Sequence, residues 1–175
     1  TMSKGLSGSY NAACQAADAY MEENPGKKAY IFNTLSAGPQ QAFLNEKVME
    51  LADQGLDFET IKEKALEYYK NTHILFCLES MMNLARNGRV SPTAAKIAGI
   101  LGIRVCGEAQ GGTIVPIHKP RGAKKTIQTL VEMIKERGFQ DGNILRIAHC
   151  FGEDSACALR DAVLKEFPNT RFVLE

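Results

Sequence analysis

Apolar residues recur with helical spacing along several stretches of the chain. From Tyr10 to Met21 they fall at positions i, i+3, i+4 and i+7, the spacing of one face of an α-helix. Ser7 is expected to cap the start of this helix, and Asn24 with the Pro-Gly pair after it is expected to end it. Asp57 is expected to cap a later helix. The pattern predicts further helices over 40–53, 57–70, 79–86, 93–101, 123–137 and 155–167.

Short runs of β-branched and aromatic residues predict strands between these helices. They cover 28–33, 72–78, 103–109, 113–118, 143–149 and 170–174. The first half of the chain is therefore typical of parallel α/β structure, although no strand precedes its first helix and the chain is expected to begin at the tip of a missing strand. Gly111 and Gly112 lie between two later strands and predict a hairpin, hence antiparallel pairing in the second half.

These elements predict an α/β fold in two lobes. Residues 1–71 are expected to form the remainder of a first, parallel α/β lobe, and residues 72–175 a second α+β lobe with an antiparallel or mixed sheet. The helix over 93–101 is apolar on nearly every side, with Lys96 its only charge. Such a helix either lies in the core or lines an apolar cavity, and the pattern leaves both interpretations open.

Composition and charge narrow the class of protein. The chain of 175 residues is 45% apolar and 23% charged, as in ordinary soluble globular proteins. Its formal net charge of +1 gives no overall field that would draw it to nucleic acid or to an anionic membrane. The five cysteines form no CxxC motif, so we expect reduced thiols, no metal site and a cytoplasmic location. We also expect no cofactor and no stable membrane anchoring.

The loop before the first helix carries the clearest candidate site. In residues 3–9 (SKGLSGS), three hydroxyls and two glycines precede a helix. Backbone N–H groups and hydroxyls then converge at the positive end of the helix dipole, which suits a carboxylate, phosphate or sulfate. An ordinary Gly/Ser-rich loop with an N-cap explains the same residues equally well, and the spacing does not decide between the two.

Other chemistry-bearing residues are better explained as structural. His73, His118 and His149 lie far apart in the sequence and form no recognisable ligand cluster. His149 and Cys150 are neighbours on a predicted strand, so they are expected to point to opposite faces and cannot act as a base and its nucleophile. The basic stretch 119–125 either forms a solvated turn or leaves room for an anionic ligand or an acidic partner. The glycine motifs of nucleotide-binding loops do not occur.

Several segments match, in order, the motifs of one known family. A family loop that reads roughly SSxLSGTY stands here as SKGLSGSY at 3–10. Further matches are IFNTLSAG at 31–38, where Asn33 replaces the usual acidic residue, and MMNLARNGRV at 81–90. The helix and strand of 91–105 and the hairpin with its K-x-R-x-x-K-K stretch at 113–125 complete the series. Together they resemble the DegV family of bacterial fatty acid-binding proteins, the lipid-carrying subunits of the fatty acid kinase system.

The resemblance implies a DegV-like fold and a carrier, not an enzyme. Such a carrier holds a long-chain fatty acid between two lobes and presents its carboxylate to a separate fatty acid kinase, which phosphorylates it to an acyl phosphate. The resemblance also implies a fragment, because family members have an α/β segment before this loop and a Gly-rich tail after the last strand. The lipid-binding residues that it implies are Ser3, Gly5, Ser7 and Gly8 at the carboxylate, Arg89 near the head group, and Ile97 and Ile100 in the apolar wall.

Two other classes of protein stay open from the residues alone. A Ser/Gly anion loop on an α/β lobe suits a small-molecule phosphotransferase or hydrolase, although the sequence has no Mg²⁺/phosphate motif and no nucleophile–base pair. A fragment that only makes regulatory interactions is the third class. In the carrier interpretation, Arg121, Lys124 and Lys125 are candidates to face the kinase.

Overall fold

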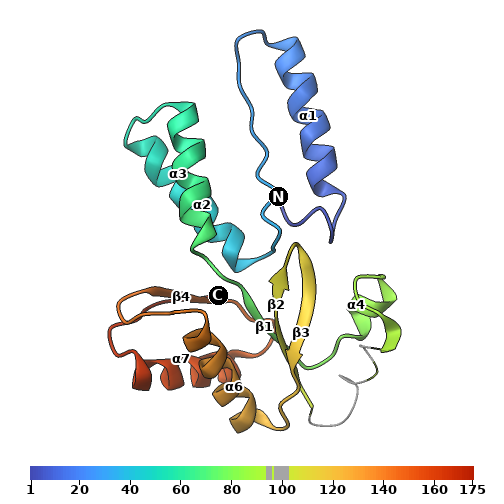
Figure 1. Ribbon diagram of the computed structural model, residues 1–175, viewed down its shortest axis with the longest axis vertical. Helices are drawn as coiled ribbons and strands as arrows, with labels where there is room; N and C mark the ends of the chain where they lie inside the picture. Colours follow the sequence, from blue (N-terminus) through green and yellow to red (C-terminus); the bar gives the residue numbers. More distant parts are fainter. Residues whose placement is uncertain (94–95, 97–102) are drawn as a thin grey trace. The chain divides into compact units, whose positions relative to one another are not determined.

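The computed structural model describes residues 1–93, 96 and 103–175. Helices alternate with antiparallel and parallel strands, which confirms the predicted mixed α/β class (Figure 1). The chain divides into two compact units: the first is Thr1–Ile74 with Ala109–Thr113, and the second is Leu75–Glu108 with Ile114–Glu175. Most of the helix predicted over 93–101, including Ile97 and Ile100, lies outside the described residues.

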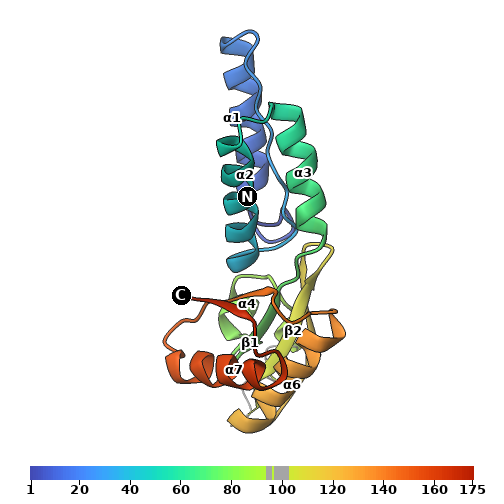
Figure 2. The same cartoon turned by 90° about the vertical axis from the view of Figure 1, so that its left-hand side faces the viewer.

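Two helices of the first unit form a packed pair. They are α2 (Pro39–Asp53) and α3 (Phe58–Lys70), which lie side by side in both views (Figures 1 and 2). Leu44 and Leu51 of α2 and Ala65 of α3 are buried in one cluster, as the helical spacing predicts. The apolar faces of the two helices therefore close on each other.

The start of α3 is capped as predicted. The Asp57 carboxylate accepts hydrogen bonds from the backbone N–H groups of Glu59 at 3.0 Å and Thr60 at 3.2 Å. The Thr60 hydroxyl donates a third hydrogen bond to it at 2.6 Å. These bonds satisfy N–H groups that the first turn of a helix leaves without a partner.

Helix α1 (Ser9–Glu23) covers the predicted range but starts differently. Its N-cap is Gly8, whose φ of −70° and ψ of −4° are already helical, so the prediction that Ser7 caps this helix was wrong. The Ser7 hydroxyl instead accepts a hydrogen bond from the N–H of Ser9 at 3.2 Å. The helix gives way to Asn24 at its C-terminal end, as predicted.

The segment 28–33 is extended but is not a strand, so that prediction was wrong. The segment runs between α1 and the α2–α3 pair (Figure 1). A strand needs a continuous hydrogen-bond ladder to a neighbour. Among the described residues, only Thr1 forms ladder-like hydrogen bonds with this part of the chain. Its amine donates to the carbonyl of Phe32 at 2.9 Å, and its carbonyl accepts from the N–H of Thr34 at 3.3 Å.

Most of a three-stranded sheet lies in the second unit, whereas the tip of its hairpin, Ala109–Thr113, belongs to the first. Its strands, in sheet order, are β1 (Leu75–Leu78), β2 (Val105–Gln110) and β3 (Thr113–His118). β1 and β2 are antiparallel, with Cys77 opposite Cys106. Gly111 and Gly112 have φ angles of 56° and 86°. Positive φ at both central residues is what a tight two-residue hairpin turn requires, so the predicted hairpin is confirmed.

The rest of the second unit combines helices with a parallel pair of strands. Its elements are α4 (Met82–Arg86), α6 (Ala123–Glu136), β4 (Ile144–Ile147), α7 (Glu153–Glu166) and β5 (Arg171–Leu174). β4 and β5 pair in parallel. Val131 and Ile134 of α6 and Val163 of α7 are buried in one apolar cluster. The second unit thus has both antiparallel and parallel pairing.

Candidate functional site

Two loops of the first unit meet at a group of buried hydroxyls. One loop precedes α1 and contains Ser3, and the other precedes α2 and contains Thr34 and Ser36. The N–H of Ser3 donates to the carbonyl of Ser36 at 2.9 Å. The side-chain oxygen of Asn33 accepts from the N–H of Lys4 at 3.3 Å, which ties the loops together a second time. The side chains that meet here are called the hydroxyl cluster and are Ser3, Thr34, Ser36 and Tyr69.

Ser3 joins its loop to the tip of the β2–β3 hairpin. Its side chain is fully buried. The hydroxyl donates to the carbonyl of Gly112 at 2.7 Å and accepts from the N–H of Gly5 at 3.1 Å. Gly112 has a positive φ of 86°, and a Cβ at this position would stand 2.4 Å from the Ser3 hydroxyl. Glycine is therefore required at the hairpin tip, and the hydroxyl proton of Ser3 is already in use.

Thr34 and Tyr69 are linked in the same cluster. The Thr34 hydroxyl donates to the carbonyl of Thr1 at 2.8 Å, and the Tyr69 hydroxyl donates to the carbonyl of Thr34 at 2.9 Å. Burial raises the pKa of Tyr69, and the neighbouring Thr34 and Ser36 groups oppose that rise. Tyr69 is therefore a neutral hydrogen-bond donor at physiological pH, so the cluster carries no negative charge from this group.

Ser36 differs from the other members of the hydroxyl cluster. Its side chain is only 2% exposed, and its Oγ makes no hydrogen bond of normal geometry among the described residues, although it lies near enough to the Tyr69 hydroxyl to lower the pKa of that group. A buried hydroxyl without a partner is costly and uncommon in folded proteins. A polar atom of a ligand at this point would satisfy it, which makes Ser36 the clearest sign of a binding site in the first unit.

The surroundings of the cluster favour an anionic head group with an apolar body. The two adjoining helices, α1 and α2, are both fully described, and neither has a side-chain cap or an acidic residue in its first turn. Their positive dipole ends therefore remain open to an anion. Leu35, between the buried Thr34 and Ser36, has a φ of 52° and is 43% exposed. It places an apolar side chain next to the hydroxyls.

The structure brings together four of the residues predicted to bind lipid. Ser3, Gly5, Ser7 and Gly8 lie in one loop; Ser3 is buried, Ser7 half-buried and the two glycines are exposed. Arg89 belongs to the second unit. It is exposed, follows Gly88 after α4, and its guanidinium donates to the carbonyl of Asn87. Ile97 and Ile100 lie outside the described residues.

Sequence reasoning missed Thr34, Ser36 and Tyr69 as members of the site. The stretch 31–38 was singled out for its resemblance to a family motif but was given no role. The composition of a Ser/Gly-rich stretch is the same in a solvent-exposed loop and in a buried one, so the sequence does not distinguish them. The available signal was the second Ser/Gly-rich loop before a helix, which repeats the composition of residues 3–9.

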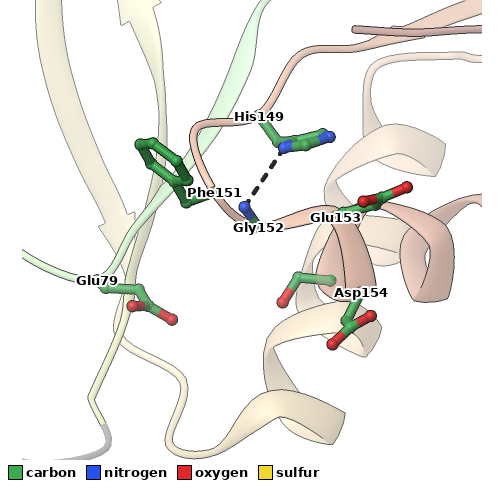
Figure 3. A pocket seen from close by; sticks show the side chains of 7 residues that line it. Glu79, His149, Phe151, Gly152, Glu153 and Asp154 are labelled. Carbon is green, nitrogen blue, oxygen red and sulfur yellow. Dashed lines mark hydrogen bonds between the residues drawn. The ribbon is translucent and has the colours of Figure 1, made fainter.

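A surface pocket of about 640 Å³ in the second unit is lined by acidic side chains, unlike the neutral hydroxyl cluster (Figure 3). Three carboxylates, those of Glu79, Glu153 and Asp154, line it together with the ring of Phe151. Phe151 is fully exposed and has a φ of 55°. Because like charges repel, this pocket does not suit a carboxylate or a phosphate. An anionic ligand is better matched by the hydroxyl cluster.

His149 and Cys150 lie in a loop, because β4 ends at Ile147. The prediction that they stand on a regular strand was therefore wrong. Cys150 is exposed, and the Nδ1 atom of His149 accepts a hydrogen bond from the N–H of Gly152 at 3.3 Å (Figure 3). That bond occupies one ring nitrogen with a local structural contact.

The basic stretch 119–125 presents cationic side chains to solvent. Arg121, Lys124 and Lys125 are exposed, and the last two stand in the first turn of α6. Over residues 1–93, 96 and 103–175, no three His, Cys, Asp or Glu side chains gather in a way that could hold a metal ion. In the same part of the chain, no helix combines the length and apolar character needed to cross a membrane.

Comparison with solved structures finds close similarity over nearly the whole chain. A DegV family protein from Eubacterium eligens loaded with heptadecanoic acid is 36% identical, with a TM-score of 0.93 over 99% of this chain and 63% of that one. The Streptococcus pneumoniae Fatty Acid Kinase (Fak) B3 protein loaded with linoleic acid is 34% identical, with a TM-score of 0.95 over 99% of this chain and 62% of that one.

Comparison of sequences leads to the same family. A DegV domain-containing protein of Streptococcus pneumoniae is 36% identical over 169 residues, which are 96% of this chain and 60% of the relative. The chain thus spans about three fifths of the length of its curated relatives. The sequence model of the DegV family, described as uncharacterised proteins, matches residues 1–174. With a family match of this extent and a predicted DegV-like fold found in the structure, the chain belongs to the DegV family.

Proposed function

We propose that this chain is part of a protein that binds a long-chain fatty acid and presents its carboxylate to a separate fatty acid kinase, which converts it to an acyl phosphate. Two relatives more than 30% identical to the chain were solved with heptadecanoic and linoleic acid, and one of them is a Fatty Acid Kinase B3 protein. We also propose a lobe boundary near residue 71, which the division of the chain after Ile74 supports.

The unpaired hydroxyl of Ser36 is the observation that carries the proposal. A carboxylate oxygen can accept the hydrogen bond that Ser36 Oγ does not make within the described part of the chain. The neighbouring loop adds Ser7 and the backbone at Gly5 and Gly8. Ser3 joins the carboxylate site when its hydroxyl turns from the carbonyl of Gly112, to which it now donates. Neutral donors suit an anion because the hydroxyls of the cluster add no negative charge that would repel it.

The acyl chain supplies most of the binding free energy. Each buried CH₂ group contributes roughly 0.8 kcal/mol, so a C16–C18 chain binds tightly with few polar contacts. Leu35, exposed beside the hydroxyl cluster, is a first apolar contact for the carbon next to the carboxylate. Ile97 and Ile100, which lie outside the described residues, remain predicted members of the apolar wall.

Positive charge serves two further roles in the proposal. Arg89, in the turn after α4, remains a predicted head-group residue, since a guanidinium binds a carboxylate or an acyl phosphate through two parallel hydrogen bonds. Arg121, Lys124 and Lys125 form an exposed basic surface that suits contact with the kinase. The alternative, a phosphotransferase or hydrolase, is less well supported because the solved relatives are described as loaded with fatty acid.

The proposal is tested by fatty acid binding to matched serine variants. Native mass spectrometry of the 175-residue chain is expected to show a C16–C18 fatty acid adduct. In Ser36→Ala the affinity for palmitate is expected to fall roughly 10- to 100-fold, the range expected for one hydrogen bond to a charged group. Ser155→Ala, in the acidic pocket of the second unit, is the control and is expected to bind like wild type.

Two results would contradict the proposal in different ways. If a protein that contains this chain at the full length of its relatives binds no fatty acid, the carrier function is wrong. If the wild type binds but Ser36→Ala, Ser7→Ala and Arg89→Ala all bind equally well, the head-group assignment is wrong. Formation of product from ATP and fatty acid by this chain without a kinase would favour the enzyme alternative.

A further inference from the structure

Strands β1 and β2 place two cysteines directly opposite each other. In their antiparallel register Cys77 faces Cys106, with the pairs Phe76–Gly107 and Leu78–Val105 on either side. Directly opposed residues of an antiparallel pair have their side chains on the same face of the sheet. The two thiols are in hydrogen-bond contact, and both cysteines are free.

Packing holds this pair in place. Cys106 is fully buried with Leu130 and Met133 of α6, and Cys77 packs at the edge of the same cluster with part of its surface accessible. Close packing leaves neither thiol an alternative position, so the sulfur atoms stay next to each other. The partial exposure of Cys77 gives a small oxidant a route to one sulfur but not to the other.

The two thiols are also chemically unequal. The hydrogen bond from Cys106 lowers the pKa of Cys77, burial opposes this, the nearby Arg104 lowers it further, and Glu79 raises it. The same hydrogen bond and burial raise the pKa of Cys106. Arg104 is held beside the pair by its ion pair with Glu79 at 2.5 Å. Because the thiolate is the reactive form, Cys77 is the thiol that reacts first.

We propose that Cys77 and Cys106 form a reversible disulfide when the protein meets a peroxide. Directly opposed residues in antiparallel strands have Cα atoms about 4.5 to 5.5 Å apart, and disulfides span about 4.4 to 6.8 Å between Cα atoms. The bond therefore forms without a change of register. It closes the segment between the two strands, which includes α4 and Arg89, into a covalent loop.

The chemistry proceeds in two balanced steps. The Cys77 thiolate attacks one oxygen of hydrogen peroxide, the O–O bond breaks, and Cys77 becomes a sulfenic acid as hydroxide leaves. The Cys106 sulfur then attacks the Cys77 sulfur, the S–O bond breaks, and the departing hydroxide takes the proton of Cys106 as water. Two thiols are oxidised, one peroxide is reduced, and after protonation of the first hydroxide two waters are released.

The main test leaves the pair intact and removes the other three cysteines. In the variant with Cys14→Ser, Cys150→Ser and Cys157→Ser, hydrogen peroxide is expected to lower the mass by about 2 Da, and dithiothreitol is expected to restore it. Both remaining thiols are expected to become unreactive to iodoacetamide, and the digest is expected to contain one peptide that links Cys77 to Cys106. Two free thiols after treatment, or only oxygen adducts, would overturn the proposal.

A second test checks the order of reaction. In the same background, Cys106→Ala is expected to accumulate a sulfenic acid on Cys77 that dimedone traps, whereas Cys77→Ala is expected to show at least tenfold less trapped product. Circular dichroism establishes that each variant is folded. Equal trapping in the two folded variants would contradict the assignment of Cys77 as the attacking thiol.

Discussion

The two units differ in what they bury. The buried residues of the first unit include four polar side chains, those of Ser3, Thr34, Ser36 and Gln40, beside Leu44, Leu51 and Ala65. Those of the second unit, as far as the structure describes it, also include four polar side chains, of Glu108, Thr126, Thr129 and Thr170, but these stand beside ten apolar ones, among them Val105, Leu130, Val131, Met133, Ile134 and Val163. Buried hydroxyls add little stability, whereas each buried aliphatic side chain contributes about 1.5 to 3 kcal/mol. The second unit is therefore built for stability, and the first holds polar groups that suit a ligand.

Helices α1 and α6 show the same difference on a smaller scale. Both have apolar residues at helical spacing, yet α6 buries six of its residues and none of the fifteen residues of α1, all of them described, is buried. The two helices share a similar pattern of apolar residues but are buried to different extents. An apolar stripe shows which face a helix turns inward, but the neighbouring elements decide how far that face is covered.

The largest loss of stability is expected when a side chain in the apolar interior of the second unit is shortened. Met133, 2% exposed, packs in the cluster with Cys106 and Leu130. Met133→Ala is expected to lower the free energy of unfolding by about 2–5 kcal/mol, since it removes buried methylene groups and leaves a cavity. Met49→Ala, at a residue of α2 that is 65% exposed, is the matched control, with a change of at most about 0.5 kcal/mol. Urea denaturation followed by circular dichroism compares the two variants; equal losses would contradict the packing of Met133 in the interior of the second unit.

A smaller loss is expected from the hydroxyl cluster. Ser3→Ala removes the hydrogen bonds to the carbonyl of Gly112 and from the N–H of Gly5. The expected loss is about 1–3 kcal/mol, because both backbone groups lose a buried partner. Ser9→Ala, at an exposed serine six residues later, is the control and is expected to change stability by less than about 0.5 kcal/mol. The same denaturation experiment measures both, and a neutral Ser3→Ala would show that these bonds do not stabilise the first unit.

A modest pH effect is expected at the cap of α3. Hydrogen bonds from the Thr60 hydroxyl and backbone lower the pKa of Asp57 below its ordinary value of 3.8. The unfolded chain therefore binds this proton more readily, so the stabilisation is complete above the ordinary pKa and is lost as the pH falls through the lowered one. Asp57→Asn keeps a capping side chain that does not titrate. The difference in melting temperature between wild type and Asp57→Asn is expected to shrink by a few degrees between about pH 6 and pH 3; a constant difference would contradict this.

The smallest effect on stability is expected for Ser36→Ala. The hydroxyl that this change removes is buried and has no hydrogen-bond partner among the described residues. The ligand-free protein is therefore expected to lose nothing, or to gain up to about 1 kcal/mol, since an unpaired buried polar group is removed. Together with weaker fatty acid binding, this result separates Ser36 from Ser3. A clear loss of stability in Ser36→Ala without ligand would show that the hydroxyl is paired within the fold.

The helices were largely predictable because their signals are local. The stripe that contains Leu44 and Leu51, the carboxylate of Asp57 and the glycine pair at 111–112 each act within a few residues of their own position. The segment 28–33 was not predictable in the same way, because a strand exists only where another strand pairs with it. Its composition is that of a strand, but its hydrogen bonds with Thr1 do not continue into a ladder along the segment.

The sequence predicted one loop of the candidate site but not the residues that this loop meets. The composition of residues 3–9 was enough to indicate an anion loop, and a resemblance in sequence was enough to indicate a family. The burial of Ser36, its contact with Ser3 and the pairing of Cys77 with Cys106 came from elements distant in the sequence; the hydrogen bond from Ser3 to Gly112 joins residues 109 positions apart. Local spacing therefore determined where helices and turns form in this protein. Tertiary structure alone decided which hydroxyls and thiols meet away from water, because burial and pairing depend on partners that no short stretch of sequence contains.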